Sequence, residues 1–220
     1  MRLVWRDNQH HRDDIAHGYI DMLRRAKHQV IIANAYFFPG YRLLKEMRDA
    51  AERGVQVQLI VQGRPDIAIV KEGVELLYNY LVTSGVEVYE YCRGPLHAKI
   101  ALQDEFLSTV GSSNLDPLSL SLNLEANLFI HDQVFNKEMR SNLNQLLQHD
   151  CQRVQENQLP VRSGWQLIKS VLAFHFLRHF PAIAGWLPAH TPKLTEVAPP
   201  VQPEMETQDH VTPGNKKVKF

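Results

Sequence analysis

A histidine and a lysine stand two positions apart in the stretch LHAKIALQDEFLSTVGSSNLD, residues 96–116. Successive side chains of a β-strand point to opposite faces of the sheet, so His97 and Lys99 would share one face. The other face is apolar and consists of Leu96, Ala98, Ile100 and Leu102. The pattern predicts a strand with one face in the core and one face that carries chemistry. Because an edge strand of any sheet shows polar residues outward, the pair alone does not identify a site.

The rest of the stretch extends this pattern over fixed spacings. The fixed positions are His97, Lys99, Asp104, Gly111, Ser112 and Asn114, with Glu125 on the next expected strand. The spacing resembles the HKD signature of the phospholipase D superfamily, which is H-x-K-x4-D followed by G-S-x-N. The resemblance covers about residues 1–152 and implies a phospholipase D-like α/β domain.

These residue types suit the transfer of a phosphoryl group. A phosphodiester repels anionic nucleophiles, so the neutral imidazole of His97 is suited to attack phosphorus or to act as acid/base partner of the attacker. Negative charge that grows on the non-bridging oxygens is stabilised by the ammonium of Lys99, the amide of Asn114 and the hydroxyl of Ser112. Gly111 would let the backbone approach the phosphate closely. The scheme needs no metal or other cofactor.

Two carboxylates need separate interpretation. Asp104 belongs to the family motif and is grouped with the catalytic residues, but it lies in an expected turn, where it can equally accept hydrogen bonds from backbone amides. Glu125 shares a face of its expected strand with Asn123 and Asn127. In the family, a carboxylate at this place helps to orient the histidine pair. A surface glutamate is the alternative.

The superfamily's active site joins two HKD motifs, in which one histidine attacks and the other protonates the leaving alkoxide. Among the 11 histidines only His97 is followed by x-Lys, so the chain holds half a site. It either pairs with a copy of itself or is the second half of a two-motif enzyme, with its other half in cis or in trans. Residues 33–66 resemble the second half of bacterial cardiolipin synthases, of the B type especially, which favours the second option. The resemblance places the aromatic loop of Tyr36, Phe37 and Phe38 near the active site.

Helical and strand patterns alternate along the first part of the chain. The expected helices cover residues 13–27, 41–53, 67–83 and about 132–152. The expected strands cover residues 3–5, 28–38, 55–63, 86–91, 96–102, 106–113 and 123–130. This order predicts an α/β fold with a mixed sheet flanked by helices, in which the last strands include antiparallel pairs.

Composition narrows the function. Lysine plus arginine number 24, as do aspartate plus glutamate, so the chain lacks the basic excess of a dedicated nucleic-acid binder, and nucleic acid is not expected as a partner. Cys92 and Cys151 are far apart in sequence and have no metal-ligand spacing, which fits free thiols in a reducing compartment. The N-terminal stretch MRLVWRDNQHHRDD is too polar for a signal peptide.

The C-terminal third differs from the rest. Residues 163–190 are rich in Trp, Phe and Leu, but Lys169, Arg178 and Pro181 make them too charged and too broken to span a bilayer. They either lie in a membrane interface or pack on the domain. Residues 191–220 contain many prolines and polar residues without an apolar period, which predicts a disordered tail. The expected organisation is a catalytic domain (1–155), an amphipathic or hydrophobic segment (156–190) and a tail (191–220).

The resemblance implies a phosphatidyltransferase of the cardiolipin-synthase type. A phosphatidyl group would be held on histidine and passed to a hydroxyl of phosphatidylglycerol, releasing a small alcohol such as glycerol. Such an enzyme would bind phospholipids at the membrane surface, as a peripheral protein on the cytosolic side of the inner membrane. Two alternatives stay open: a homodimeric HKD phosphodiesterase or endonuclease, and an inactive HKD-derived membrane-binding module. Strongly salt-dependent DNA binding would favour the first, and lipid binding without turnover the second.

Overall fold

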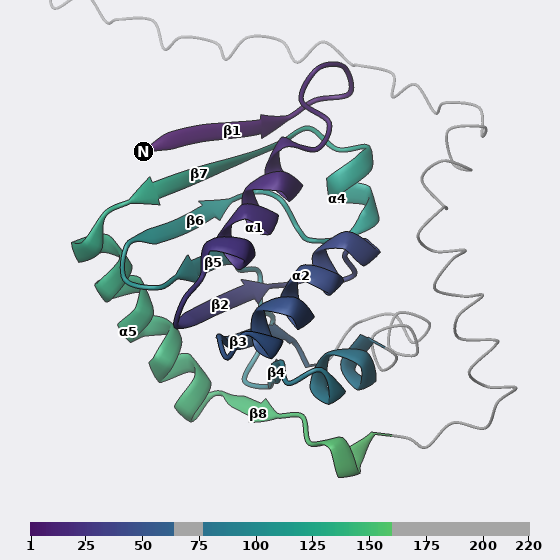
Figure 1. Ribbon diagram of the computed structural model, residues 1–220, viewed down its shortest axis with the longest axis vertical. Helices are drawn as coiled ribbons and strands as arrows, with labels where there is room; N and C mark the ends of the chain where they lie inside the picture. The colour runs from purple at the N-terminus through teal and green to yellow at the C-terminus, as the bar shows by residue number, and fades with distance from the viewer. Residues whose placement is uncertain (64–76, 160–220) are drawn as a thin grey trace, which may run out of the picture. The chain divides into compact units, whose positions relative to one another are not determined.

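The computed structural model describes residues 1–63 and 77–159 (Figure 1). Its centre is a sheet in which eight strands follow the order β1-β7-β6-β5-β2-β3-β4-β8. The strands are β1 (Arg2–Arg6), β2 (Gln29–Asn34), β3 (Gln56–Gln62), β4 (Glu87–Tyr91), β5 (Lys99–Gln103), β6 (Leu107–Gly111), β7 (Glu125–His131) and β8 (Cys151–Arg153). The pairs β2–β3 and β3–β4 are parallel and the other pairs are antiparallel. The predicted mixed sheet is confirmed.

Helices cover both faces of the sheet. They are α1 (Asp14–Arg25), α2 (Tyr41–Glu52), the short α4 (Pro117–Ser121) and α5 (Gln133–His149), followed by the 3-10 turn η1 (Glu156–Gln158). Residues 77–83 are helical too. They are the last part of the helix predicted for residues 67–83, and its first part lies outside the described residues. In Figure 1, α1 and α2 lie side by side over one face of the sheet.

The core is divided by the sheet into two layers. The larger layer includes Ile15 and Leu23 of α1, Met47 of α2, and Ile32 of β2. The second layer lies against α5 and consists of Ile31, Ala33, Ile60, Leu102 and Leu143. Neighbouring residues of β2 belong to different layers, as the alternation of a strand requires. In β5, Ala101 packs in the first layer and Leu102 in the second, so the predicted alternation of this strand is confirmed.

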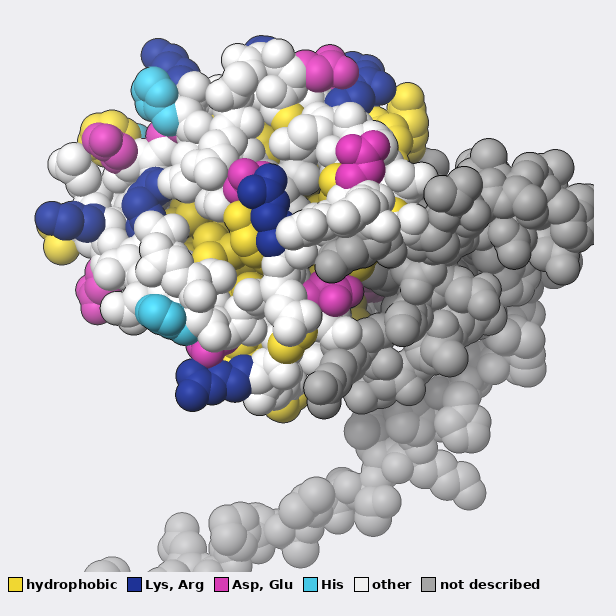
Figure 2. Space-filling view, turned by 90° about the horizontal axis from the view of Figure 1, so that it is seen from below, with side chains coloured by type: hydrophobic (Ala, Val, Ile, Leu, Met, Phe, Trp, Pro, Cys, Tyr) yellow, Lys and Arg dark blue, Asp and Glu magenta, His cyan; other side chains and the backbone are white. Residues whose placement is uncertain are grey.

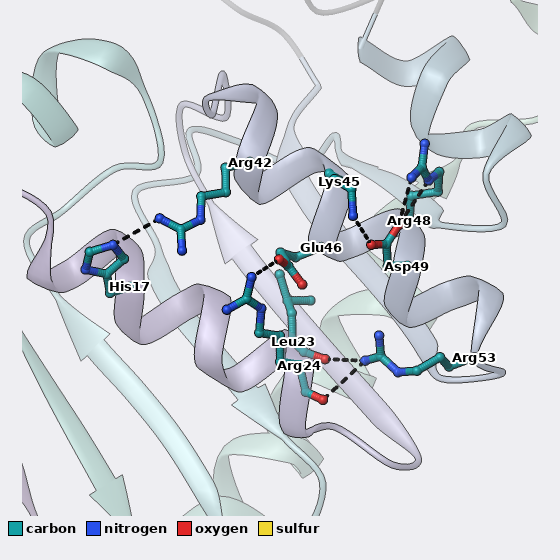
Figure 3. A network of polar contacts seen from close by, with 9 residues as sticks. All are labelled: His17, Leu23, Arg24, Arg42, Lys45, Glu46, Arg48, Asp49 and Arg53. Carbon is teal, nitrogen blue, oxygen red and sulfur yellow. Dashed lines mark hydrogen bonds and ion pairs between the residues drawn. The ribbon is translucent and has the colours of Figure 1, made fainter.

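Polar contacts join α1 to α2 (Figure 3). Arg24 forms an ion pair with Glu46, whose exposed fraction is only 7%. Arg53 donates a hydrogen bond at 2.7 Å to the carbonyl of Leu23, close to the end of α1. These contacts fix the two helices against each other, although an ion pair at the surface contributes about 0–1 kcal/mol.

The helix predicted to reach about residue 152 ends at His149, so this prediction is wrong at its C-terminal end. The start agrees, because the side chain of Asp132 caps the helix by accepting from Phe135 N at 2.8 Å. At the other end, Cys151–Arg153 leave the helix and pair with the outer side of β4. The outer edge of β4 carries backbone N–H and C=O groups that need hydrogen-bond partners. Pairing with these groups favours a strand over a longer helix for residues 151–153.

Figure 2 views the molecule from the side on which β8 lies in Figure 1. Lysine and arginine side chains are interspersed there with aspartate and glutamate, around a hydrophobic area. Cys92 and Cys151 are both free thiols and both partly exposed. Burial raises the pKa of the Cys151 thiol to about 11. Cys151 is paired with Tyr91, the residue before Cys92, so the two cysteines lie near each other although they are far apart in sequence.

Within residues 1–63 and 77–159, no helix is long and apolar enough to cross a membrane. The predicted C-terminal segment (156–190), apart from its first residues in η1, and the predicted tail (191–220) lie outside the described residues.

Candidate active site

The ends of four strands meet at one edge of the sheet. β2 ends at Asn34, which is paired with Lys99 at the start of the antiparallel β5. β6 ends at Gly111, which is paired with Asn127 near the start of β7. Polar residues just beyond these strand ends are therefore brought together, although they are far apart in sequence. Ligand sites of open α/β sheets commonly form at such an edge.

His97 and Lys99 differ in their exposure. His97 lies in the extended segment just before β5 and is exposed, whereas the exposed fraction of Lys99 is 7%. The Lys99 ammonium contacts the carbonyl of His97 at 3.4 Å. Burial lowers the pKa of Lys99 below 10.5, and the charges of Glu125 and Asp116 partly offset this effect. This edge thus presents an accessible imidazole next to a poorly hydrated cation.

Ser112 and Glu125 contact each other across β6 and β7. The hydroxyl of Ser112 donates to Glu125 Oε2 and accepts from Ala126 N at 3.1 Å. Asn123 Nδ2 donates to the other carboxylate oxygen of Glu125 at 3.3 Å. The carboxylate is therefore held by Ser112 and Asn123, and its predicted role in orienting histidine stays a prediction.

Gly111 and Asn114 occupy the loop side of the site. A Cβ atom at Gly111 would lie 2.3 Å from Asn127 Oδ1, so the packing of Asn127 is by itself a sufficient reason for glycine. The predicted approach of its backbone to phosphate stays a prediction. Asn114 is half-buried, and its Oδ1 is buried without a hydrogen-bond partner among the described residues. The side-chain amide also has two N–H donors, which suit an anionic oxygen.

Asp104 lies at the other end of β5 from Lys99 and is not brought to the site. Its carboxylate accepts hydrogen bonds from the backbone amides of Lys27 at 3.0 Å, His28 at 2.8 Å and Gln29 at 3.0 Å. Burial alone would raise the pKa of Asp104, but these amides outweigh it and hold the pKa below 3.8. The contacts are those of a residue that joins the β5–β6 turn to the start of β2, which favours the structural interpretation over the catalytic grouping.

The three aromatic residues of the loop after β2 differ in their exposure. Tyr36 is 50% exposed, Phe37 is 6% exposed and packs in the larger core layer, and Phe38 is half-buried. The loop touches the segment after Asn114, because Phe38 N donates to the carbonyl of Leu115 at 2.7 Å and Phe37 forms a β-bridge with Leu115. Of the three aromatics, Tyr36 is the one most available to a substrate.

Three buried polar residues around this edge were given no role from the sequence: Asn34, Asn127 and Arg6. Arg6 is 3% exposed, and its guanidinium donates to the carbonyls of Ser121 and Asn123, which holds the loop before β7. A polar residue inside an apolar run, such as Asn34 in VIIANAYFF, is the one signal that the sequence offers.

Comparisons with known proteins agree with this geometry. Residues 19–147 match the family described as cardiolipin synthase, PLD-like domain. The chain is 68% identical over 216 residues to cardiolipin synthase B of Salmonella typhi and 64% identical over 217 residues to cardiolipin synthase B of Escherichia coli (strain K12). These alignments cover 98% and 99% of this chain and 52% of each relative, so the chain spans about half the length of the curated relatives that it matches.

Two solved structures share the fold. The phospholipase D family member Nuc from Salmonella typhimurium superposes with a TM-score of 0.57 at 19% identity, over 70% of this chain and 97% of Nuc. The phosphatidylserine synthase of Haemophilus influenzae gives a TM-score of 0.61 at 15% identity, over 83% of this chain and 45% of that chain. The predicted phospholipase D-like fold is confirmed.

Proposed function

Because this chain belongs to the family of phospholipase D-like cardiolipin synthase domains, we propose that it forms one half of the active site of a phosphatidyltransferase that makes cardiolipin. The observation that carries the proposal is the exposed His97 beside the buried Lys99, which forms no ion pair with another described residue, at an edge that also holds Ser112 and Asn114. The donor would be phosphatidylglycerol and the released alcohol would be glycerol.

The proposed reaction has two displacements. In the first, an imidazole nitrogen of His97 attacks the phosphorus of one phosphatidylglycerol, an N–P bond forms, and the P–O bond to glycerol breaks. The glycerol oxygen takes its proton from an acid in the other half-site. In the second, a hydroxyl of another phosphatidylglycerol attacks phosphorus, the N–P bond breaks, and the hydroxyl proton returns to that same group. Cardiolipin leaves and both half-sites are regenerated.

The other groups would stabilise charge during both steps. A buried ammonium interacts with the non-bridging oxygens more strongly than a solvated one, because little water screens it. Lys99 therefore gains interaction energy as these oxygens become more negative. The amide of Asn114 would donate to the same oxygens, and the hydroxyl of Ser112 would do so once it rotates away from Glu125. The exposed Tyr36 would contact the lipid near the phosphate.

The remaining parts of the assembly belong to the same proposal. Since the chain carries one HKD motif and spans about half of its curated relatives, the acid would come from a second HKD half, in cis, in trans or from a copy of this chain. We retain a catalytic domain over residues 1–155, a segment at 156–190 and a tail at 191–220. The protein would act as a peripheral protein on the cytosolic side of the inner membrane, where its substrates are.

The proposal is tested with phosphatidylglycerol labelled in its terminal glycerol. The purified chain, alone and together with a candidate first half, is incubated with the lipid, and cardiolipin and free glycerol are quantified. We expect the two products in equal amounts when both halves are present. His97→Ala should abolish both products without lowering Tm, because the side chain is exposed. His10→Ala, which removes another exposed histidine outside the site, is the matched control. Near-normal turnover by folded His97→Ala would reject the nucleophile assignment.

A further inference from the structure

Two asparagines outside the HKD motif are completely buried beside the site. Asn34 ends β2 and Asn127 lies in β7, and both have an exposed fraction of 0%. Asn34 is paired with Lys99, and Asn127 with Gly111. Continuing the β5–β6 register by one residue places Gly111 opposite Lys99, so both asparagines share the face of Lys99. A buried amide costs free energy unless hydrogen bonds compensate it, and this pair therefore requires an explanation.

Asn34 holds the residue that follows Asn114. Its Oδ1 accepts a hydrogen bond from Leu115 N at 3.0 Å. Its Nδ2 is buried and has no hydrogen-bond partner within the described part of the chain. An aliphatic side chain would avoid that unpaired donor, so what the asparagine provides at this position is the acceptor for Leu115.

Asn127 holds the residue that precedes Asn114. Its Oδ1 accepts from Ser113 N at 3.4 Å, and its Nδ2 lies 3.4 Å from both Tyr19 Oη and Thr109 Oγ1. The side-chain oxygen occupies the space that a Cβ atom at Gly111 would need. The amide of Asn127 is therefore fixed from several sides while it faces Ser113.

Ser113 and Leu115 flank Asn114 in a segment that is neither helix nor regular strand, so their N–H groups depend on side-chain acceptors. We propose that Asn34 and Asn127 are positioning residues that hold these two amides and so fix Ser112 and Asn114 beside Lys99. The inference rests on the proposed function, because it concerns catalysis only if Ser112 and Asn114 bind the transferred phosphoryl group.

Removal of the acceptor in Asn34→Ala is the main test, made in the assembly that is active with both halves. We expect the Leu115 amide to exchange with deuterium at least about tenfold faster, because its hydrogen bond is lost. We expect kcat to fall by about 10- to 100-fold with a much smaller change in KM, because a small displacement of a catalytic group has this effect. The affinity for inorganic phosphate, measured by calorimetry, should fall as well.

Two further variants sharpen the test. Asn34→Asp keeps an oxygen acceptor, so the Leu115 amide should remain as protected as in the unmodified protein. Asn127→Ala should make the Ser113 amide exchange faster with deuterium in the same way. The loss of kcat should be smaller, because the hydrogen bond from Ser113 N to Asn127 Oδ1 is longer, at 3.4 Å. If Asn34→Ala does not fold, Asn127→Ala carries the test at Ser113.

Asn136 supplies a matched control. It is also 0% exposed, but it lies on α5 and donates to the carbonyl of Leu107 at 2.9 Å and to Ser108 Oγ at 3.2 Å, at the other end of β6. Asn136→Ala should lower Tm and leave kcat and the exchange of Leu115 unchanged. Unchanged Leu115 exchange in Asn34→Ala, or an equal loss of kcat in Asn34→Ala and Asn136→Ala, would overturn the inference. Because exchange and phosphate binding need no turnover, they test it even if no cardiolipin is made.

Discussion

At the scale of single residues, Lys99 is placed where its charge can act on a substrate but lowers the stability of the folded state. It is 7% exposed, its hydrogen bond to the His97 carbonyl is long, and it takes part in none of the ion pairs between described residues. A buried ammonium without a close counter-charge destabilises the folded state. The lowered pKa of Lys99 has the same cause.

Lys99→Met should therefore separate activity from stability. The methionine keeps most of the apolar stem and removes the charge, so we expect Tm to rise while transfer falls by about a hundredfold or more. Thermal melts and the glycerol-release assay measure the two effects. Lys137→Met, on the exposed side of α5, is the control and should change neither. A variant that loses activity and also melts lower would contradict the assignment of an unpaired buried charge.

The pH dependence follows from the direction of the same shift. Activity requires the ammonium form of Lys99, whose pKa lies below 10.5 because of burial. Transfer should therefore decline with rising pH before a solvated lysine would titrate. The folded state should become more stable as pH rises through this lowered pKa towards 10.5, since the unfolded chain then binds more protons. Lys99→Arg stays charged up to about pH 12 and above. If kcat/KM of Lys99→Arg falls at the same alkaline pH as that of the unmodified protein, the fall is due to a group other than Lys99.

Residue types and spacing were sufficient to propose His97, Lys99, Ser112 and Asn114 as site residues, because the chemistry constrains them locally. The role of Asp104 could not be decided in this way, since its partners at residues 27–29 are contributed by another strand. The role of Asn34 could not be predicted from the sequence either, because its partner Leu115 is 81 positions away in sequence.

At the scale of elements, the turn between β5 and β6 is tied to the start of β2 by one side chain. Asp104 has a φ of 44° and its carboxylate serves three consecutive backbone amides. Left-handed backbone of this kind is tolerated by Asp and Asn better than by most residues. The turn thus depends on both the backbone and the side-chain oxygens of Asp104.

Asp104→Ala should lower the free energy of unfolding by about 2–4 kcal/mol, because hydrogen bonds to a charged acceptor are lost and the positive φ is retained. The activity of the folded fraction should stay near normal. Asp104→Asn should cost less, since it keeps one acceptor oxygen. Because the pKa is lowered in the fold, the stabilisation by Asp104 is present above pH 3.8 and is lost as pH falls through the folded pKa. A large loss of kcat with unchanged Tm would restore a catalytic role.

The helix and strand patterns located most elements because amphipathic periods are local properties. The patterns gave a wrong prediction at β8. NLNQLLQHDCQRV continues a helical spacing past His149, but pairing with the free edge of β4 makes residues 151–153 a strand. They also missed the short α4, whose first turn is capped by Asp116 Oδ1 accepting from Ser119 N at 3.0 Å. The insertion of β5 between β6 and β2 could not be predicted, because strand order depends on non-local pairing.

At the scale of the whole molecule, the proposed reaction needs a second histidine that this chain does not supply in an HKD motif. The chain as a strict monomer should therefore be inactive. Size-exclusion chromatography followed by assay of each fraction decides this. If two copies form the site, mixing His97→Ala with Lys99→Met chains should not restore normal activity, because both halves of each mixed dimer are defective. A fully active monomer of 220 residues would refute the half-site.

Truncation before Ser163 tests the proposed membrane contact. If residues 164–188 are interfacial, their apolar surface contributes about 25 cal/mol per Å² removed from water, and Lys169 and Arg178 add attraction to anionic lipid. The truncated chain should then stay in solution when phosphatidylglycerol vesicles are sedimented, with an unchanged Tm. Packing of the segment on the domain predicts a lower Tm and weak vesicle binding of both chains. Equal binding by both chains would refute the anchor.

The pairing of β1 with β7 also has a consequence during synthesis. Arg6 is opposite Glu125, 119 residues later, and this pair borders the site. At about 5–20 residues per second, the ribosome makes β7 on the order of ten seconds after β1. Until then β1 is an unpaired strand with Leu3 and Trp5 side chains, so the site edge is completed late and folding of this edge should depend on translation rate. Slow codons placed after residue 131 would give the first strand time to find its partner.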